Sequence, residues 1–301
     1  TLLAFLSSGD HILLQKDIYG GTRNLVEAQF DRFNIDYTFT DDIDLKCFKS
    51  GIKKNTKVIY IETPSNPLLK IIDIEKIAQF AKSRDIITII DNTFATPIIQ
   101  KPILFGVDVV LHSATKYFGG HSDISAGAVA ASQTHIDKIW NLAKNLGGNL
   151  SDYSVWLLER SMKTLSIRVK AQQKNAKKLA KYLSESRYVK KVYYPGLKNH
   201  PNHNLAKKQM KGYGAMISFE FIDKIDPSLF LTSLNLIKPS MSLAGVESTM
   251  LSPAETSHYL LTENERLSQG ITNELIRFSV GIENKKDIIM DIEHAIKLAI
   301  K

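Results

Sequence analysis

Residues 109–123 contain the stretch that decides the fold, VVLHSATKYFGGHSD. It opens with an apolar run, residues 109–112, of the length of a buried strand, and polar residues follow at once. Ser113 and Thr115 are two hydroxyls spaced i, i+2, and Lys116 comes directly after them. Hydroxyls and loop amides can bind a phosphate group, and a partly desolvated lysine can form a Schiff base. Taken alone, Lys116 is more simply one exposed lysine among many.

Six apolar or β-branched runs of strand length alternate with amphipathic stretches in the first half of the chain. They are residues 11–15, 37–40, 57–61, 86–90, 109–112 and 126–131. Apolar strands separated by helices are typical of a parallel sheet that helices cover on both faces. Ligands of such sheets bind at the carboxyl ends of the strands. The functional residues are therefore expected immediately after each run.

The second half of the chain has a different pattern. Longer helices begin near residue 150, two strands are expected at 215–221 and 275–280, and an amphipathic helix is expected at 287–300. This pattern predicts a smaller α+β domain after a larger α/β domain. We expect residues 1–150 to form the large domain, and residues 151–301 to form a linker helix and the smaller domain.

The composition is that of a folded protein and excludes several classes. The 301 residues carry a net charge of +8, and 44% of them are hydrophobic, which excludes disorder and fibrous repeats. No apolar run approaches the roughly 18 residues that span a bilayer. Cys47 is the single cysteine, which excludes an internal disulfide and a cysteine-based zinc site. We expect no bound metal and a reducing, cytoplasmic location. The chain starts without methionine, and we expect it to be part of a longer protein and to begin inside a helix.

Residues 163–211 form a basic block, with fourteen lysines and arginines against a single acid, Glu185. Such a block can bind nucleic acid. However, the apolar residues within it fall on one helical face, at positions 165, 169, 176, 179, 180 and 183. We therefore interpret the lysines as the solvated face of a helix and disfavour nucleic acid as a partner.

Polar residues follow three further strands of the predicted sheet. Asp91 comes directly after the run 86–90, Asn66 lies in a turn bounded by two prolines, and Tyr19 precedes a glycine pair. Asp91 alone is more simply a cap of a helix or turn. Together with Lys116, these residues supply what pyridoxal phosphate (PLP) needs: a carboxylate for its ring nitrogen, a Schiff-base lysine, a stacking aromatic ring and hydrogen-bond donors.

These residues belong to a longer pattern that resembles the Cys/Met-metabolism family of PLP enzymes. Its members include cystathionine γ-synthase, cystathionine γ- and β-lyases and methionine γ-lyase. Seven motifs of the family recur in order over essentially the whole chain, at residues 19–22, 62–67, 91–94, 113–123, 194–197, 242–248 and 277–283. The resemblance implies fold type I, in which a mostly parallel sheet of the seven-stranded type carries helices on both faces. It also implies that residues 1–150 bind PLP, with the N-terminal part missing, and that residues 151–301 include the substrate domain.

The resemblance implies roles for the residues at the strand ends. Lys116 would hold PLP as a Schiff base and move protons, and Asp91 would pair with the ring nitrogen. Tyr19 would stack on the ring and, with Lys116, count among the catalytic residues. Ser113 and Thr115 would bind the phosphate group.

The same resemblance implies a substrate site. Asn66 would contact the phenolic oxygen of the cofactor and, with Arg277, the substrate carboxylate. Ser242 would complete the catalytic set by positioning the lysine or the substrate. Glu247 would receive the distal ammonium group of cystathionine or cysteine. Without the family, Arg277 is simply a surface ion-pair residue, and Glu247 a surface acid.

The chain departs from the family in two places. A Tyr-x-Arg element and a Ser-Gly-Met turn, which bind the cofactor phosphate, would precede Thr1 and are absent from the sequence. Ala244 replaces a glycine that is usual there, which we expect to be tolerated. Because the family builds its sites from two subunits, the resemblance implies a homo-oligomer, a dimer of dimers.

The resemblance leaves the reaction open between replacement and elimination. We favour cystathionine γ-synthase, because residues 200–210 are most similar to bacterial synthases, with the γ- or β-lyase as the alternative. Methionine γ-lyase is disfavoured, because Gly21 stands where it has a cysteine and residues 245–247 lack its Asp-Ala-Glu sequence. A different alternative is a basic interaction protein with a degenerate PLP site, which uses the block 163–211.

Overall fold

The computed structural model describes residues 1–256, 259 and 262–301. The chain forms two compact units. The first consists of residues 1–66, 70–114 and 125–156, and the second of residues 67–69, 115–124 and 157–301. The division into functional domains at residue 150 stays a prediction.

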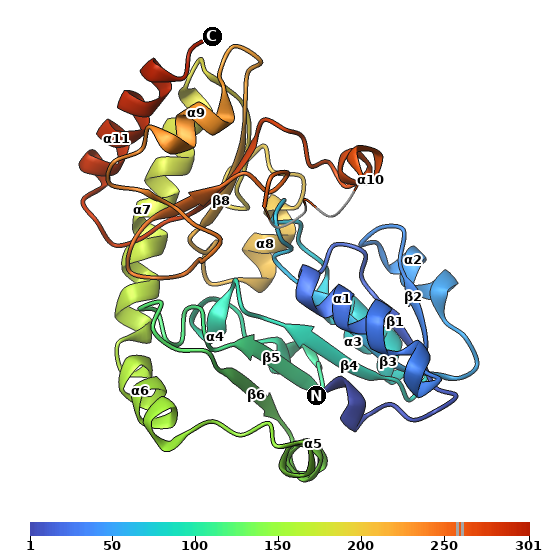
Figure 1. Cartoon of the computed structure of the whole chain (residues 1–301). Helices are drawn as coiled ribbons and strands as arrows, with labels where there is room; N and C mark the ends of the chain where they lie inside the picture. The colour runs from blue at the N-terminus through green and yellow to red at the C-terminus, as the bar shows by residue number, and fades with distance from the viewer. Residues whose placement is uncertain (257–258, 260–261) are drawn as a thin grey trace. The chain divides into compact units, whose positions relative to one another are not determined.

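The first unit alternates strands and helices along the chain (Figure 1). Its elements are η1 (Leu2–Ala4), β1 (His11–Leu14), α1 (Gly20–Gln29), η2 (Asp31–Phe33), β2 (Asp36–Phe39), α2 (Leu45–Gly51), β3 (Thr56–Glu62), α3 (Ile74–Lys82), β4 (Ile87–Asp91), α4 (Thr96–Ile99), η3 (Pro102–Phe105), β5 (Val109–Ser113), β6 (Gly127–Ala131) and α5 (Gln133–Leu146). Helix α6 (Asp152–Met162) includes the junction with the second unit.

The strands of the first unit form one sheet in the order β2-β1-β3-β4-β5-β6. All neighbouring pairs are parallel except β5 with β6, which is antiparallel. The mostly parallel sheet agrees with the prediction, and the described residues supply six strands to it rather than seven. Because β3, β4 and β5 run in the same direction, their carboxyl ends meet at one edge of the sheet.

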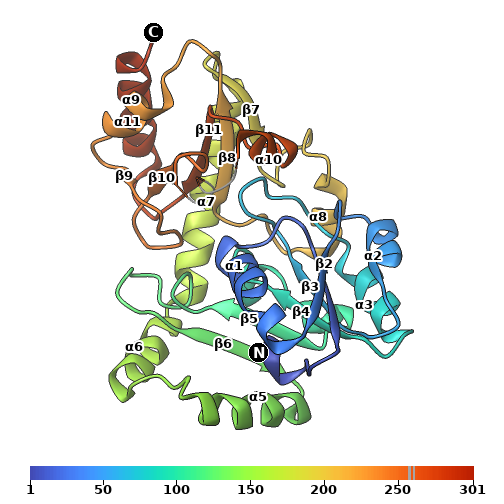
Figure 2. The same ribbon diagram turned by 45° about the vertical axis from the view of Figure 1, so that its right-hand side comes forward.

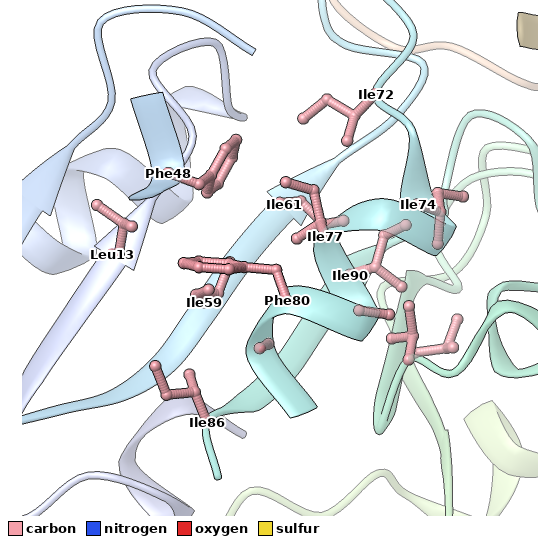
Figure 3. Close-up of a cluster of buried hydrophobic side chains, with 14 residues drawn as sticks. Leu13, Phe48, Ile59, Ile61, Ile72, Ile74, Ile77, Phe80, Ile86 and Ile90 are labelled. Atoms are coloured by element: carbon pink, nitrogen blue, oxygen red, sulfur yellow. The ribbon is translucent and has the colours of Figure 1, made fainter. Parts of the chain in front are cut away.

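Alternate side chains of the strands pack on opposite faces of this sheet. Leu13, Ile59 and Ile90 pack against α2 and α3 on one face (Figure 3). Their neighbours in sequence pack on the other face in a second cluster, which includes Val26 and Phe30 at the end of α1. Such burial stabilises the fold by about 1.5–3 kcal/mol for each large apolar side chain. The predicted cover of helices on both faces is therefore present.

The second unit has a smaller sheet and a long helix. Its elements are α7 (Leu165–Glu185), β7 (Val189–Tyr193), α8 (His203–Gln209), β8 (Met216–Phe221), α9 (Pro227–Thr232), β9 (Lys238–Pro239), β10 (Thr249–Leu251), α10 (Glu263–Ser268), β11 (Leu275–Ser279) and α11 (Lys285–Leu298). The sheet order is β7-β8-β11-β10-β9, and Figure 2 shows β8, β11 and β10 running side by side. The two predicted strands and the closing helix are thus present, within a few residues of the expected bounds.

Helix α7 carries five of the fourteen basic residues of the block as exposed lysines, at positions 170, 174, 177, 178 and 181. The six apolar residues predicted to share one face are all buried. Arg168 is also buried, at 5% exposure, so this arginine does not belong to the solvated basic face with which it was grouped. In the described part of the chain, no helix combines the length and the apolar character that crossing a membrane requires.

Candidate active site

The first unit brings Asp91 and Ser113 together at the carboxyl edge of its sheet. Asp91 is the last residue of β4 and pairs with Glu62, the last residue of β3. The Thr93 amide donates to Asp91 Oδ1 at 2.8 Å, and the Ser113 amide donates to Thr93 Oγ1 at 2.8 Å. Thr93 therefore fixes the ends of β4 and β5 to each other, as a ligand site at this edge requires.

The charged forms of two carboxyl groups, those of Asp91 and Glu62, are disfavoured at this edge. Burial raises the pKa of Asp91, and hydrogen bonds from Thr93 act in the opposite direction. Burial and the neighbouring Asp91 raise the pKa of Glu62 well above its usual value. None of the ion pairs among the described residues includes Asp91. A half-buried carboxyl without a cationic partner among the described residues fits the protonated ring nitrogen of PLP, which would supply the missing charge.

Tyr19 and Asn66 are held by the same carboxyl group. The Tyr19 amide donates to Glu62 Oε2 at 2.8 Å, and the Asn66 amide also donates to the Glu62 carboxyl. The Glu62 amide in turn donates to Gln15 Oε1 at 2.8 Å. The Tyr19 side chain itself is 56% exposed, so its ring is available for stacking on a ligand. Glu62 thus ties two predicted cofactor residues to the end of β3.

The second unit contains the loop of Lys116. Burial, and then the charge of Arg277, lower the pKa of the Lys116 amine. A lowered pKa increases the share of neutral amine, which is the form that attacks an aldehyde. The Gly120 amide donates to the Lys116 carbonyl at 2.7 Å and closes the turn after the lysine. Thr115 belongs to the same loop.

Three of the four predicted substrate residues, Ser242, Glu247 and Arg277, lie in the same unit, whereas Asn66 lies in the first. Arg277 lies in β11, is 4% exposed, and donates to the Met241 carbonyl at 2.9 Å. That carbonyl precedes Ser242, which is half-buried. Ser122 Oγ donates to Glu247 Oε1 at 2.6 Å. A second hydrogen bond, of 2.9 Å, runs from the Val246 amide to the Gly120 carbonyl. Two hydrogen bonds therefore connect the loop of Lys116 with the segment that contains Glu247.

The predicted residues therefore form two groups, each inside one unit. Asp91, Ser113, Tyr19 and Asn66 lie in the first unit, and Thr115, Lys116, Ser242, Glu247 and Arg277 lie in the second. Ala244 has a left-handed φ of 69°, which explains why a glycine is usual there.

The sequence interpretation missed the residues that support the site. It included Glu62 in a motif without giving it a role, although an acid directly after an apolar run is itself a signal. Thr93 belongs to the motif 91–94, but no role was predicted for it. Arg168 was predicted only as one of the charges of the basic block.

Comparisons with known proteins identify relatives of this chain. Residues 1–297 match the family described as Cys/Met metabolism PLP-dependent enzyme. A cystathionine β-lyase of Lactococcus lactis is 45% identical over 297 residues, which are 98% of this chain and 78% of that protein. A cystathionine γ-lyase structure from Lactobacillus plantarum, complexed with L-serine, has a TM-score of 0.95 at 43% identity and covers 98% of this chain and 77% of its own. A cystathionine γ-synthase structure from Xanthomonas oryzae, in complex with cystathionine, has a TM-score of 0.94 at 37% identity, with the same coverage of both chains.

These matches confirm the predicted fold class, the PLP cofactor and an enzyme of cysteine and methionine metabolism. The alternative of a non-enzymatic interaction protein loses its basis. The chain belongs to the Cys/Met metabolism family of PLP-dependent enzymes.

Proposed function

We propose that this protein is a cystathionine lyase. The names of the similar lyases favour elimination, and the observation that carries cystathionine as the substrate is the direct link between the loop of Lys116 and a carboxylate, through the 2.6 Å hydrogen bond from Ser122 to Glu247. Arg277, in the same unit, is a cation that suits an α-carboxylate. Cystathionine carries an α-carboxylate at one end and an ammonium group at the far end, so it has a charge for each of these residues. The names of the similar lyases support the same substrate.

We assign the residues of the cofactor site as follows. Lys116 binds the cofactor aldehyde through its amine, and Asp91 holds the proton on the ring nitrogen. Tyr19 stacks on the ring, and Ser113 and Thr115 donate hydrogen bonds to the phosphate group. When bound, PLP accepts the negative charge that develops at the substrate Cα.

The protein residues perform the steps around that charge. Lys116 takes the proton from Cα and returns a proton later in the reaction. Asn66 and Arg277 hold the α-carboxylate, so that the Cα–H bond has one orientation, and Ser242 fixes the lysine or the substrate beside them. Glu247 holds the distal ammonium group.

Product analysis on the full-length protein tests this proposal. Cleavage of cystathionine at Cγ with one water gives cysteine, 2-oxobutanoate and ammonia, whereas cleavage at Cβ gives homocysteine, pyruvate and ammonia. Either set of products, formed catalytically, supports a lyase and identifies the bond that breaks. Absence of both sets, with PLP bound, contradicts the proposal.

Cystathionine γ-synthase is the second candidate, and it is the reaction favoured on the sequence alone. The similarity to the Xanthomonas oryzae γ-synthase structure supports it. In that case the sulfur of cysteine would form a bond to Cγ of an activated homoserine ester, the acyloxy group would leave as a carboxylate, and the product would be cystathionine. Two incubations distinguish the candidates, one with the ester and cysteine and one with cystathionine, because a synthase accumulates cystathionine in the first and a lyase consumes it in the second.

We also propose a cytoplasmic homo-oligomer, a dimer of dimers with shared sites. The single Cys47, which is free, suits a reducing compartment. Large apolar side chains that are more than half exposed, Trp156 on α6 and Ile167 on α7 among them, offer surface for a second copy. Light scattering on the full-length protein tests the assembly, and an active monomer would contradict it.

A further inference from the structure

Arg168 is a buried guanidinium whose partners are all uncharged. It donates from Nη1 to the Tyr117 carbonyl at 2.7 Å and from Nη2 to the Phe118 carbonyl at 3.2 Å. Nη2 also donates to the Ser161 carbonyl at 2.9 Å, and Nε donates to Thr164 Oγ1 at 3.0 Å. No ion pair among the described residues includes Arg168. Burying a cation is costly unless hydrogen bonds compensate, so these contacts have to be retained together.

Two of these acceptors follow Lys116 immediately in the chain. The carbonyls of Tyr117 and Phe118 are the next two after the lysine, and the Gly120 amide closes the turn onto the Lys116 carbonyl. A Cβ atom at Gly120 would lie 1.9 Å from Arg168 Nη1, and Gly120 has a φ of +71°. The guanidinium thus fills the space inside the turn, and the turn cannot shift without losing contacts to Arg168.

The next turn of α7 also donates a side-chain hydrogen bond to a backbone carbonyl, here in the segment before Glu247. Gln172, one helical turn after Arg168 and fully buried, donates from Nε2 to the Gly245 carbonyl at 2.6 Å. The Val246 amide donates to the Gly120 carbonyl. One face of α7 therefore holds both the loop after Lys116 and the segment that leads to Glu247.

We propose that Arg168 is a positioning residue for Lys116. It fixes the backbone after the lysine and so sets the place of the lysine amine, without touching cofactor or substrate. The inference rests on the proposed role of Lys116 as the cofactor lysine. A planar guanidinium reaches several carbonyls at once, whereas the ammonium of a lysine is a point charge and cannot hold them in the same geometry.

The test compares Arg168→Lys with Leu179→Ala in the full-length, PLP-loaded protein. Leu179 is a fully buried residue of the same helix, 11 positions further on. Leu179→Ala should therefore lower the thermal stability without disturbing the lysine loop. Arg168→Lys should lower kcat for cystathionine by about 10- to 100-fold at a similar KM, because a misplacement of about 1 Å can cost on the order of 100-fold. It should also change the circular dichroism of the visible cofactor band, which reports how the bound chromophore is held. Leu179→Ala should lower Tm and leave kcat and this dichroism unchanged.

A milder pair of variants covers the case in which Arg168→Lys fails to fold. Thr164→Val removes the acceptor of the Nε donor, and Thr164→Ser keeps it. We expect Thr164→Val to lower kcat and to change the visible dichroism in the same sense as Arg168→Lys. Thr164→Ser should have the kcat and the dichroism of the wild type.

Three outcomes overturn the inference. In the first, Arg168→Lys lowers Tm alone and keeps the wild-type kcat and dichroism. In the second, Arg168→Lys does not fold and Thr164→Val has the wild-type kcat and dichroism. In the third, the wild-type protein has no visible band. That last result refutes the proposed function as well, whereas the first two refute only the role of Arg168.

Discussion

Replacing Glu247 by glutamine removes a charge and little else. The 2.6 Å hydrogen bond from Ser122 Oγ ends on Glu247 Oε1, and a glutamine retains an oxygen acceptor at that atom. The loop geometry should therefore survive in Glu247→Gln. The negative charge that would bind a distal ammonium group is lost.

The size of the effect follows from this change. A hydrogen bond between charged groups contributes about 1.5–3 kcal/mol, which is about 10- to 150-fold in a rate or binding constant. Glu247 is only half-buried, so solvent screening favours the lower end of that range. We therefore expect kcat/KM for cystathionine to fall about tenfold.

The assay compares two substrates in the same variant. Cystathionine has the distal ammonium group, and the O-acetyl ester of homoserine lacks it. Glu247→Gln should lower kcat/KM for cystathionine and leave kcat/KM for the ester unchanged. Ser122→Ala is the control for orientation, since it keeps the charge and removes the donor. Equal losses for both substrates in Glu247→Gln would refute the specificity role.

Three further predictions concern the carboxylate contact, the ring nitrogen and the strained alanine. Arg277→Ala should lower kcat/KM for every amino-acid substrate alike, by a factor equivalent to about 2–5 kcal/mol, and Arg277→Lys should lower it as well, because an ammonium group cannot reproduce the fork of the guanidinium; steady-state kinetics on two substrates checks both. Asp91→Asn should slow turnover by orders of magnitude. In the cofactor-free protein it should raise Tm at neutral pH, because the folded pKa of Asp91 is raised, so the ionised form destabilises the fold above that pKa. This gain should disappear below the pKa of the unfolded chain, and a Tm gain that is the same at every pH would contradict it. Ala244→Gly should relieve the φ of 69° and stabilise the fold by about 1 kcal/mol, to be measured by urea unfolding; a lower midpoint would show that the lost methyl contacts matter more.

The sheet of the first unit was predictable because its central strands are buried on both faces. Runs such as residues 58–61 and 86–90 are apolar or β-branched and too short for a helix, which is typical of a buried strand between helices. The carboxyl edge followed from the same pattern, which is why Asp91 and Ser113 could be placed at strand ends. Strand β9 (Lys238–Pro239) was not predictable, because its two exposed residues leave no apolar pattern.

The supporting residues were harder to predict for a physical reason. Arg168 has the same sequence signature as an exposed arginine on a basic helix, and only the packing of the lysine loop against α7 shows that it is buried. The role of Glu62 was not predictable either, because its partners Tyr19 and Asn66 lie in turns whose conformation a single sequence does not determine. The choice between synthase and lyase depends on how a bound substrate is held, and the two reactions share the same residue types.

The most direct test of the central claim is to locate the covalently bound cofactor. The full-length protein, loaded with PLP, is reduced with borohydride, digested and mapped by mass spectrometry. We predict that the visible band disappears and that Lys116 alone carries the reduced cofactor, while Lys116→Ala yields no labelled peptide. A label on another lysine, or none on a protein that still turns over cystathionine, would contradict the account.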